Sequence, residues 1–348
     1  MNQTLNGIRR ILITILVAMG VGALFIVAIG ENPIDAYAAL FRGAFDGELR
    51  LGTTLAGFTP LLLTSIAFAV AAKAGAFNVG VEGEVFLGGI TAAYIGINWT
   101  FLPKPALYVA CFVGAMVVAA AWAFIPAVLR AYYNVNEVCT TILMNTVALY
   151  ITSYLVSGPM SAGTANAQSL PVTVRLYQFM KPSSVNVGIF IAAITVIVII
   201  FMLQKSSWGY KIRTVGLNPT HADYVGIDSK KVFVGAMMLS GMLGGMAGCI
   251  EVLGVHGYFL NNFATGLGSN GMLAALIVKN NMVSTPFMAF FLAVLKSGAM
   301  GMQQSTGVPK SLVDTITAVF IIIATMETAF QFTKKRKMKT EEKKEDKA

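Results

Sequence analysis

The chain has 348 residues, of which 56% are hydrophobic and only 12% are charged, and its mean hydropathy is +0.71. This composition excludes an ordinary soluble domain, because long stretches carry no charge at all. We therefore predict an all-α polytopic membrane protein. The net charge of +9 follows from loops and a basic tail, so no nucleic-acid partner is needed to explain it.

The apolar run at 11–30 is about 20 residues long, which is enough to cross a hydrocarbon core of roughly 30 Å. It is longer than the core of a signal peptide, so we predict a retained first span. Most of the 25 Lys and Arg residues fall at one set of span ends, which favours cytoplasmic N- and C-termini in a multi-pass protein of the cell membrane. The ten predicted spans lie near 11–30, 55–73, 77–97, 107–128, 138–157, 186–204, 232–253, 267–280, 284–302 and 311–331.

The predicted spans form one permease domain over residues 1–333, interrupted by a basic loop at 205–231. The last residues, 334–348, are rich in Lys and Glu and contain few apolar side chains. Such a segment cannot bury enough surface to fold, so we expect a disordered cytoplasmic tail close to anionic lipid.

Motifs for catalysis or metal binding are not found in the sequence. The three cysteines lie in or beside apolar runs without metal-ligand spacing, and the two histidines lie far apart. No GxxxxGK[ST] segment is present to hold a nucleotide phosphate. We therefore expect no catalytic residue, no metal site and no cofactor on this chain.

The loop at 205–231 contains the signals of a short helix. Asn218 is a good N-cap, Pro219 suits the first helical position, and Gly226 is a natural stop. A helix this short is not stable alone in water, so it needs a surface to pack on. Two interpretations remain open from these residues: a docking surface for another protein, or a helix lying on lipid.

The segment GYKIRTVGLNPTHADYVGI resembles the cytoplasmic coupling segment of ABC importer permeases of the ribose and branched-chain amino acid type. Further blocks resemble motifs of the same family in the same order. They are AFNVGVEGEVFLGG at 76–89, NVNEVCTTILMN at 134–145, SGMLGGMAGCIEVLG at 240–254, the segment from Gly266 to Ile277, and GVPKSL at 307–312. The resemblance covers residues 50 to 330.

This resemblance implies a type II importer permease that works with an ABC ATPase subunit, a second permease subunit that is related or identical, and a substrate-binding lipoprotein of the basic membrane protein type. ATP is then hydrolysed by the ATPase subunit. The residues that the resemblance assigns to ATPase coupling are Arg213, Gly216, Asn218, Pro219, Ala222, Tyr224, Gly226 and Ile227.

The motif FNVGVEGE is similar to the nucleoside and simple-sugar branch of the family, and we favour nucleosides as the small-molecule solute. A simple sugar such as ribose or galactose is the alternative, and an ion-coupled carrier working alone is an alternative of another class. The second half departs from the family pattern, because Asn270 stands where an acidic residue is expected and VKNN where a Gly/Pro turn is expected.

Glycine-rich breaks at 75–89 and 254–271 fall in two halves that the predicted span order gives opposite orientations, as in transporters built from inverted repeats. Irregular backbone at membrane depth faces protein or water. We therefore select six polar residues beside the breaks or on a neighbouring span as candidates for the substrate path: Asn78, Glu82, Glu84, Asn145, Asn262 and Asn270.

Each candidate also has a structural interpretation. Glu82 and Glu84 suit a helix N-terminus, where negative charge is favoured, and Asn145 can join helices by hydrogen bonds. Asn262 and Asn270 belong to a polar patch with His256, Asn261 and Ser269 that also suits an ordinary turn. Glu137 begins a span, where it can be a simple helix-start residue or brace the coupling segment through Arg213.

Overall fold

The computed structural model describes residues 19–307, 309, 311–315 and 318. Within these residues the chain is helical and forms no strand, although isolated β-bridges such as Ser161 to Ser169 tie the long loop at 158–187. The predicted all-α fold is therefore confirmed.

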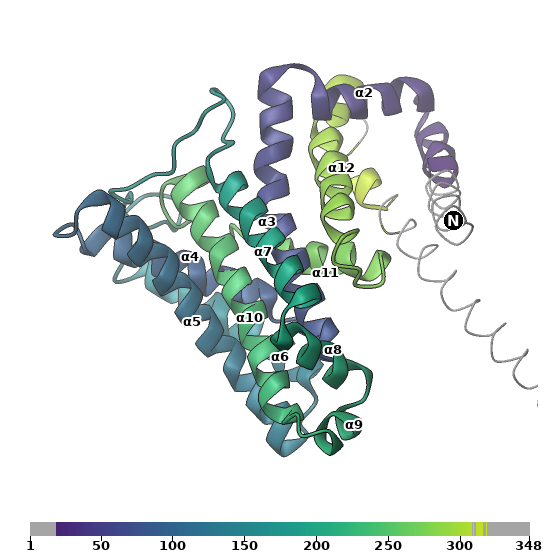
Figure 1. Cartoon of the computed structure of the whole chain (residues 1–348). Coiled ribbons are helices and arrows are strands. Elements are labelled where there is room, and N and C mark those ends of the chain that lie inside the picture. Colours follow the sequence, from purple (N-terminus) through teal and green to yellow (C-terminus); the bar gives the residue numbers. More distant parts are fainter. Residues whose placement is uncertain (1–18, 308, 310, 316–317, 319–348) are drawn as a thin grey trace, which may run out of the picture. The chain divides into compact units, whose positions relative to one another are not determined.

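The helices follow one another with short connections, apart from the 158–187 loop (Figure 1). A helical stretch Met19–Ile29 comes first. The following elements are α2 (Pro33–Phe45), α3 (Gly47–Lys73), α4 (Val81–Asn98), α5 (Lys104–Tyr133), α6 (Glu137–Ser157), α7 (Gly188–Lys205), α8 (Ser207–Leu217), α9 (Pro219–Tyr224), α10 (Ser229–Ile250), the π-helix η1 (Glu251–His256), α11 (Leu267–Ile277) and α12 (Thr285–Thr306).

The described residues divide into two compact units, one formed by 46–294 and the other by 19–45 together with the described residues from 295 onward. In the flanking unit, Leu40 of α2 packs with Ala299 and Met302 of α12 in a small buried cluster. The prediction of a single permease domain over 1–333 stays a prediction.

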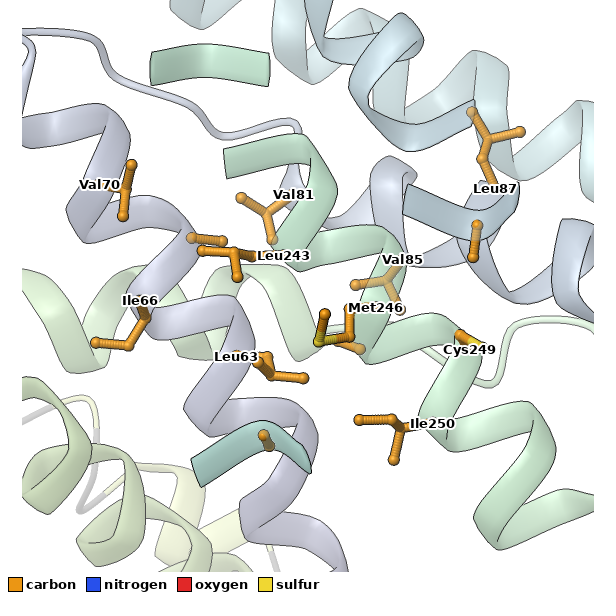
Figure 2. Packing of buried hydrophobic residues seen from close by; sticks show 14 of the residues in the cluster. Leu63, Ile66, Val70, Val81, Val85, Leu87, Leu243, Met246, Cys249 and Ile250 are labelled. Atoms are coloured by element: carbon orange, nitrogen blue, oxygen red, sulfur yellow. The ribbon is translucent and has the colours of Figure 1, made fainter. Parts of the chain in front are cut away.

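The core of the larger unit lies where α3, α4 and α10 meet. Most of α4 is buried, as is expected of a helix that is apolar on all sides and enclosed by neighbours. Figure 2 shows side chains from the three helices converging on this core. They include Leu63, Ile66 and Val70 of α3, Val81, Val85 and Leu87 of α4, and Leu243, Met246, Cys249 and Ile250 of α10.

Glycines let α4 and α10 approach closely. A Cβ atom added to Gly88 would lie 2.4 Å from the Cα atom of Gly245, and one added to Gly248 would lie 2.0 Å from the carbonyl oxygen of Val85. Any side chain at these positions would overlap the partner backbone. Small residues at a helix interface give the close packing on which association in a membrane depends, since lipid offers no hydrophobic drive between helices.

Six helices in the described part of the chain are long and apolar enough to cross a membrane, and a bent pair formed by Met19–Ile29 and α2 would make a seventh. These six agree with predicted spans and confirm a polytopic membrane protein. They are α3, α5, α6, α7, α10 with η1, and α12.

The other predicted spans, near 11–30, 77–97, 267–280 and 311–331, do not correspond to any of these six helices. α4 has 18 residues but begins with two glutamates, and it is not among the six. The predicted full span at 267–280 is corrected, because α11 has only 11 residues, about 16 Å, and ends before Lys279 and Asn280, whose φ angles are positive. Most of the predicted span 311–331, part of the span 11–30 and the whole tail lie outside the described residues.

Candidate functional site

The helix α4 begins inside the protein. The chain leaves α3 at Lys73, turns through 74–80 and starts α4 beside α11, where a Cβ atom on Gly268 would lie 2.6 Å from the backbone nitrogen of Glu82. Gly271 of α11 packs on Thr64 and Ser65 of α3, where an added Cβ atom would lie 2.8 Å from the Ser65 nitrogen, and this contact fixes α11 at this height on α3. Thr64 lies nine residues before the end of α3, so α4 begins about 14 Å inside that end.

Two asparagines from outside α4 cap its first turn. The side-chain oxygen of Asn78 accepts from the Gly80 N–H at 2.9 Å, and that of Asn145 on α6 accepts from the Gly83 N–H at 2.8 Å. The Asn145 amide also donates to the Val79 carbonyl at 2.9 Å. The N–H groups of Gly80 and Gly83 and the carbonyl of Val79 have no partner within α4, and little water reaches the start of this helix. For Asn145 the geometry favours the helix-joining interpretation.

Glu84 is buried beneath this first turn. Its Oε1 atom accepts a hydrogen bond from the Asn78 amide at 2.9 Å, and the same amide donates to the Ser240 hydroxyl of α10 at 2.9 Å. The Oε2 atom has no hydrogen-bond partner within the described residues and faces Gly244. Asn78 and Glu84 thus join the loop, α4 and α10, which is a structural role.

Glu82 is the carboxylate that lies where the start of α4 meets the start of α11. It is half-buried in the first turn of α4, and its Oε2 atom accepts from the Ser269 hydroxyl in the first turn of α11 at 3.1 Å. Two helix N-termini therefore meet at one carboxylate, well inside the span of α3. Negative charge is favoured at such ends, and ionisable groups at membrane depth are usually functional. Glu82 and Ser269 form the candidate site.

The other two predicted path residues have local roles. Asn262 is exposed with a φ of 61°, and its carbonyl accepts from Thr265, as in a turn. The Asn270 amide donates to the carbonyl of Gly266 at the start of α11. Nothing in this geometry brings either side chain to Glu82.

The remaining members of the predicted polar patch are dispersed. The His256 Nε2 atom lies 3.7 Å from the Oε2 atom of Glu251 within the same π-helix, and the Asn261 amide donates to the Ser153 hydroxyl of α6 at 3.2 Å. In the described part of the chain, no group of three His, Cys, Asp or Glu side chains is arranged to hold a metal ion.

The predicted coupling segment forms two helices, α8 and α9, that follow α7 (Figure 1). The Ser206 side chain caps α8 by accepting from the Gly209 N–H, and the Asn218 side chain caps α9 by accepting from the His221 N–H, each at 3.0 Å. Pro219 occupies the first turn of α9, as predicted, and Gly226 follows with a φ of 81°.

The inner face of the segment is fixed to the membrane helices. Ala222 is buried and its carbonyl accepts from the Ile227 N–H at 2.9 Å. The Asp223 carboxylate accepts from both the backbone and the hydroxyl of Ser229, at the start of α10. A Cβ atom on Gly216 would lie 2.0 Å from the carbonyl oxygen of Lys73, so α8 packs directly on the end of α3. Gly216 is therefore a packing position in this chain.

The outer face of the segment is apolar and uncovered. Leu217 is 88% exposed and Tyr224 is 85% exposed, and Val225 beside them is also exposed. Arg213 is partly exposed. The brace predicted between Glu137 and Arg213 is corrected, because the Oε2 atom of Glu137 lies 3.1 Å from the Nε atom of Arg130, which the short 134–136 turn brings close.

The outer face of α6 was not predicted from the sequence. This helix is the least buried of the six candidate spans, since only 17% of its most apolar stretch is buried. Its exposed face carries the hydroxyl groups of Thr146, Tyr150 and Tyr154 among aliphatic side chains, whereas the exposed face of α7 is hydrocarbon over most of its length. The exposed α6 residues are Cys139, Ile142, Leu143, Thr146, Val147, Tyr150, Ile151, Tyr154 and Ser157, and those of α7 include Phe190, Ile194, Ile197, Val198 and Phe201. The spacing of the polar side chains was the available signal.

The capping of α4 yields a first prediction. Replacing Asn145 by Ala leaves the Gly83 N–H and the Val79 carbonyl without partners, and should cost about 1–2 kcal/mol of stability. We expect a lower melting temperature of the purified protein in detergent. Thr146→Ala, at the next and exposed position, is the matched control. Equal melting of Asn145→Ala and the unaltered protein would contradict the capping role.

Comparison with known proteins gives a consistent result. The guanosine ABC transporter permease protein NupP of Bacillus subtilis is 33% identical over 330 residues, covering 92% of this chain and 94% of the relative. The glucose ABC transporter permease protein TsgB13 of Haloferax volcanii is 32% identical, covering 89% and 85%. The nucleoside ABC transporter permease protein NupB of Lactococcus lactis is 30% identical, covering 92% and 91%. No solved structure matches.

The model of one protein family matches residues 50–325, which include every helix from α4 to α12 and nearly all of α3. The chain therefore belongs to the family of branched-chain amino acid transport system permease components.

Proposed function

We propose that this chain is the membrane-spanning permease subunit of an ATP-driven importer that moves nucleosides inward across the cell membrane. The observation that carries the proposal is the similarity, along nine-tenths of each chain, to two permeases named for guanosine and nucleoside transport. The positive-inside bias supports cytoplasmic N- and C-termini, which puts α8 and α9 on the cytoplasmic side.

A simple sugar is the second candidate solute. The relative named as a glucose permease is 32% identical, which is close to the identity of the nucleoside permeases. Glu82 and Ser269 would suit the hydroxyl groups of a ribose or of a hexose equally well, so the site chemistry does not separate the two. Solute identity therefore rests on the comparison and on direct measurement.

The coupling segment is the proposed docking surface for a separate ATPase subunit that binds and hydrolyses the ATP. Exposed apolar side chains at the ends of α8 and α9 need a partner, and a docked subunit would cover Leu217 and Tyr224. The contacts of Gly216 with α3 and of Asp223 with α10 would carry the movement of that subunit into the core. A second permease subunit and a substrate-binding lipoprotein complete the proposed assembly.

The exposed face of α6 is the proposed wall of the solute path. Tyr150 is 70% exposed and lies three residues past the middle of the helix, and its hydroxyl makes no hydrogen bond within the described residues. Such a hydroxyl is unfavourable against lipid but suits water or a polar solute. The hydrocarbon face of α7 gives the contrast expected of a helix that does face lipid.

Uptake measurements test the proposed function. Cells with and without this gene are given labelled guanosine, uridine, ribose and glucose, either with ATP intact or with the proton gradient collapsed. We expect ATP-dependent loss of nucleoside uptake alone. Loss of sugar uptake would change the assigned solute to a sugar and leave the assignment as a permease intact. Uptake that depends on the proton gradient would support the ion-coupled carrier.

The coupling surface gives a further prediction. Tyr224→Ala should reduce capture of the ATPase subunit and ATP-driven uptake about tenfold, because it removes the largest exposed side chain of α9 while leaving the buried contacts of Ala222 in place. Tyr177→Ala, at an exposed position in the 158–187 loop, is the control. Unchanged capture and uptake in Tyr224→Ala, with unchanged melting, would refute this docking surface.

The α6 face can be tested by labelling with a charged thiol reagent, which needs water to react. In a Cys139→Ser background the two remaining cysteines are buried. We expect Tyr150→Cys to react at least about ten times faster than Ile197→Cys on α7, and excess solute to slow the reaction. Equal rates at the two positions would place α6 against lipid.

A further inference from the structure

A groove of about 400 Å³ lies along the seam between α5 and α10. The α5 wall is formed by Phe124, Val128 and Tyr132, which are four residues apart and so lie on successive turns of one helix face. The α10 residues that line the groove are also three or four residues apart or adjacent to one that is. The two helices run antiparallel here, since Tyr132 near the end of α5 meets the start of α10. The α10 wall consists of Lys231, Val234, Gly235 and Met238.

The seam suits a hydrocarbon chain. Eight residues separate Phe124 from Tyr132, so the groove extends for about 12 Å along the helix axis. Its walls are aliphatic and aromatic apart from the lysine and the tyrosine hydroxyl at one end. Because α5 and α10 are candidate membrane spans, the apolar length of the groove lies in the bilayer and its lysine end lies near the surface.

The surface end of the groove carries excess positive charge. The Lys231 backbone N–H, which donates to the Asp228 carboxylate, and the Lys231 ammonium, which lies 3.0 Å from it as an ion pair, hold the pKa of Asp228 below its usual value. Lys230 has no carboxylate partner within the described residues, and its Nζ atom lies 5.2 Å from the centre of the Tyr132 ring. Nearby Arg130 is neutralised by Glu137.

We propose that this groove binds an anionic phospholipid, with an acyl chain along the seam and the phosphate at Lys230 and Lys231. Basic pockets between membrane helices recognise lipid headgroups in this way. A phosphate would supply the negative charge that Lys230 lacks, whereas a second permease subunit with an apolar surface would fill the seam and leave that charge unmatched.

A second groove on the same unit provides an internal contrast. It has a volume of about 480 Å³ and lies between α5, α7 and the 158–187 loop, and its lining, which includes Tyr108, Phe112 and Ile191, contains no charged side chain. Such a groove accepts any acyl chain and gives no preference for a headgroup. Selectivity for anionic lipid should therefore depend on the lysines of the α5–α10 groove.

The lipid would lie next to the coupling segment. Gly235 forms part of the groove wall, and a Cβ atom on it would lie 3.1 Å from the ring of Trp208 on α8. An acyl chain in the seam would thus support the same stretch of α10 against which α8 packs. Occupancy by anionic lipid would then favour one position of α8, which links membrane composition to the coupling segment.

Native mass spectrometry of the full-length protein, extracted from bilayers of equal phosphatidylglycerol and phosphatidylcholine, tests the proposal. We expect at least fivefold preferential retention of phosphatidylglycerol, lost in Lys230→Gln/Lys231→Gln and kept in the control Lys205→Gln/Lys211→Gln. Val128→Trp fills the seam while keeping both lysines, and should also reduce retention. Melting curves identify any variant that fails to fold.

Equal retention of the two lipids by the unaltered protein would overturn the proposal, and so would an unchanged preference in the folded Lys230→Gln/Lys231→Gln variant. A different occupant is tested by oxidation of Met238→Cys in a Cys139→Ser background. A disulfide between two chains would show that the seam is a subunit interface, which also overturns the proposal. The retention measurement does not require transport, so its result tests lipid binding independently of the proposed solute.

Discussion

The fold depends on satisfying the backbone groups at the start of α4 away from water. A helix that begins about 14 Å inside the span of α3 exposes N–H groups where lipid and packed side chains offer no partner. The amides of Asn78 and Asn145 supply those partners from a loop and from α6. Because this start is stabilised, α4 can remain buried among α10, α5 and α6, and its first turn can meet the first turn of α11. The position of Glu82 follows from that arrangement.

Much of this fold was predictable from the sequence because its signals are local. Apolar length predicted the long spans, and Asn218, Pro219 and Gly226 predicted the short helix of the coupling segment at the residues where it occurs. The glycine-rich breaks were also visible as composition. Each of these features depends on residues within one or two helical turns, so no knowledge of tertiary contacts was needed.

The remaining features depend on contacts between distant residues. Asn145 bonds to Gly83 across 62 positions, and Glu82 bonds to Ser269 across 187. The same limit explains the wrong partner for Glu137, since Arg213 and Arg130 have the same charge and only the turn between α5 and α6 selects Arg130. The full span predicted at 267–280 rested on the number of apolar residues in that stretch. The helix α11 instead ends before Lys279 and Asn280, whose backbone lies in the left-handed region.

The contacts of the coupling segment constrain how a movement can spread. Gly216 rests on the last carbonyl of α3, and Asp223 holds the first turn of α10, so α8 and α9 are attached to two different helices. Of these two helices, α10 packs along α4, and the glycines make that contact too close to slide freely, as at Gly88 and Gly245. In the proposed function, a displacement of α9 would reach α10 through Asp223 and α3 through Gly216 of α8. α6 is joined to the start of α4 through Asn145 and is otherwise the least buried of the candidate spans, which leaves its outer face available for the solute path that we propose.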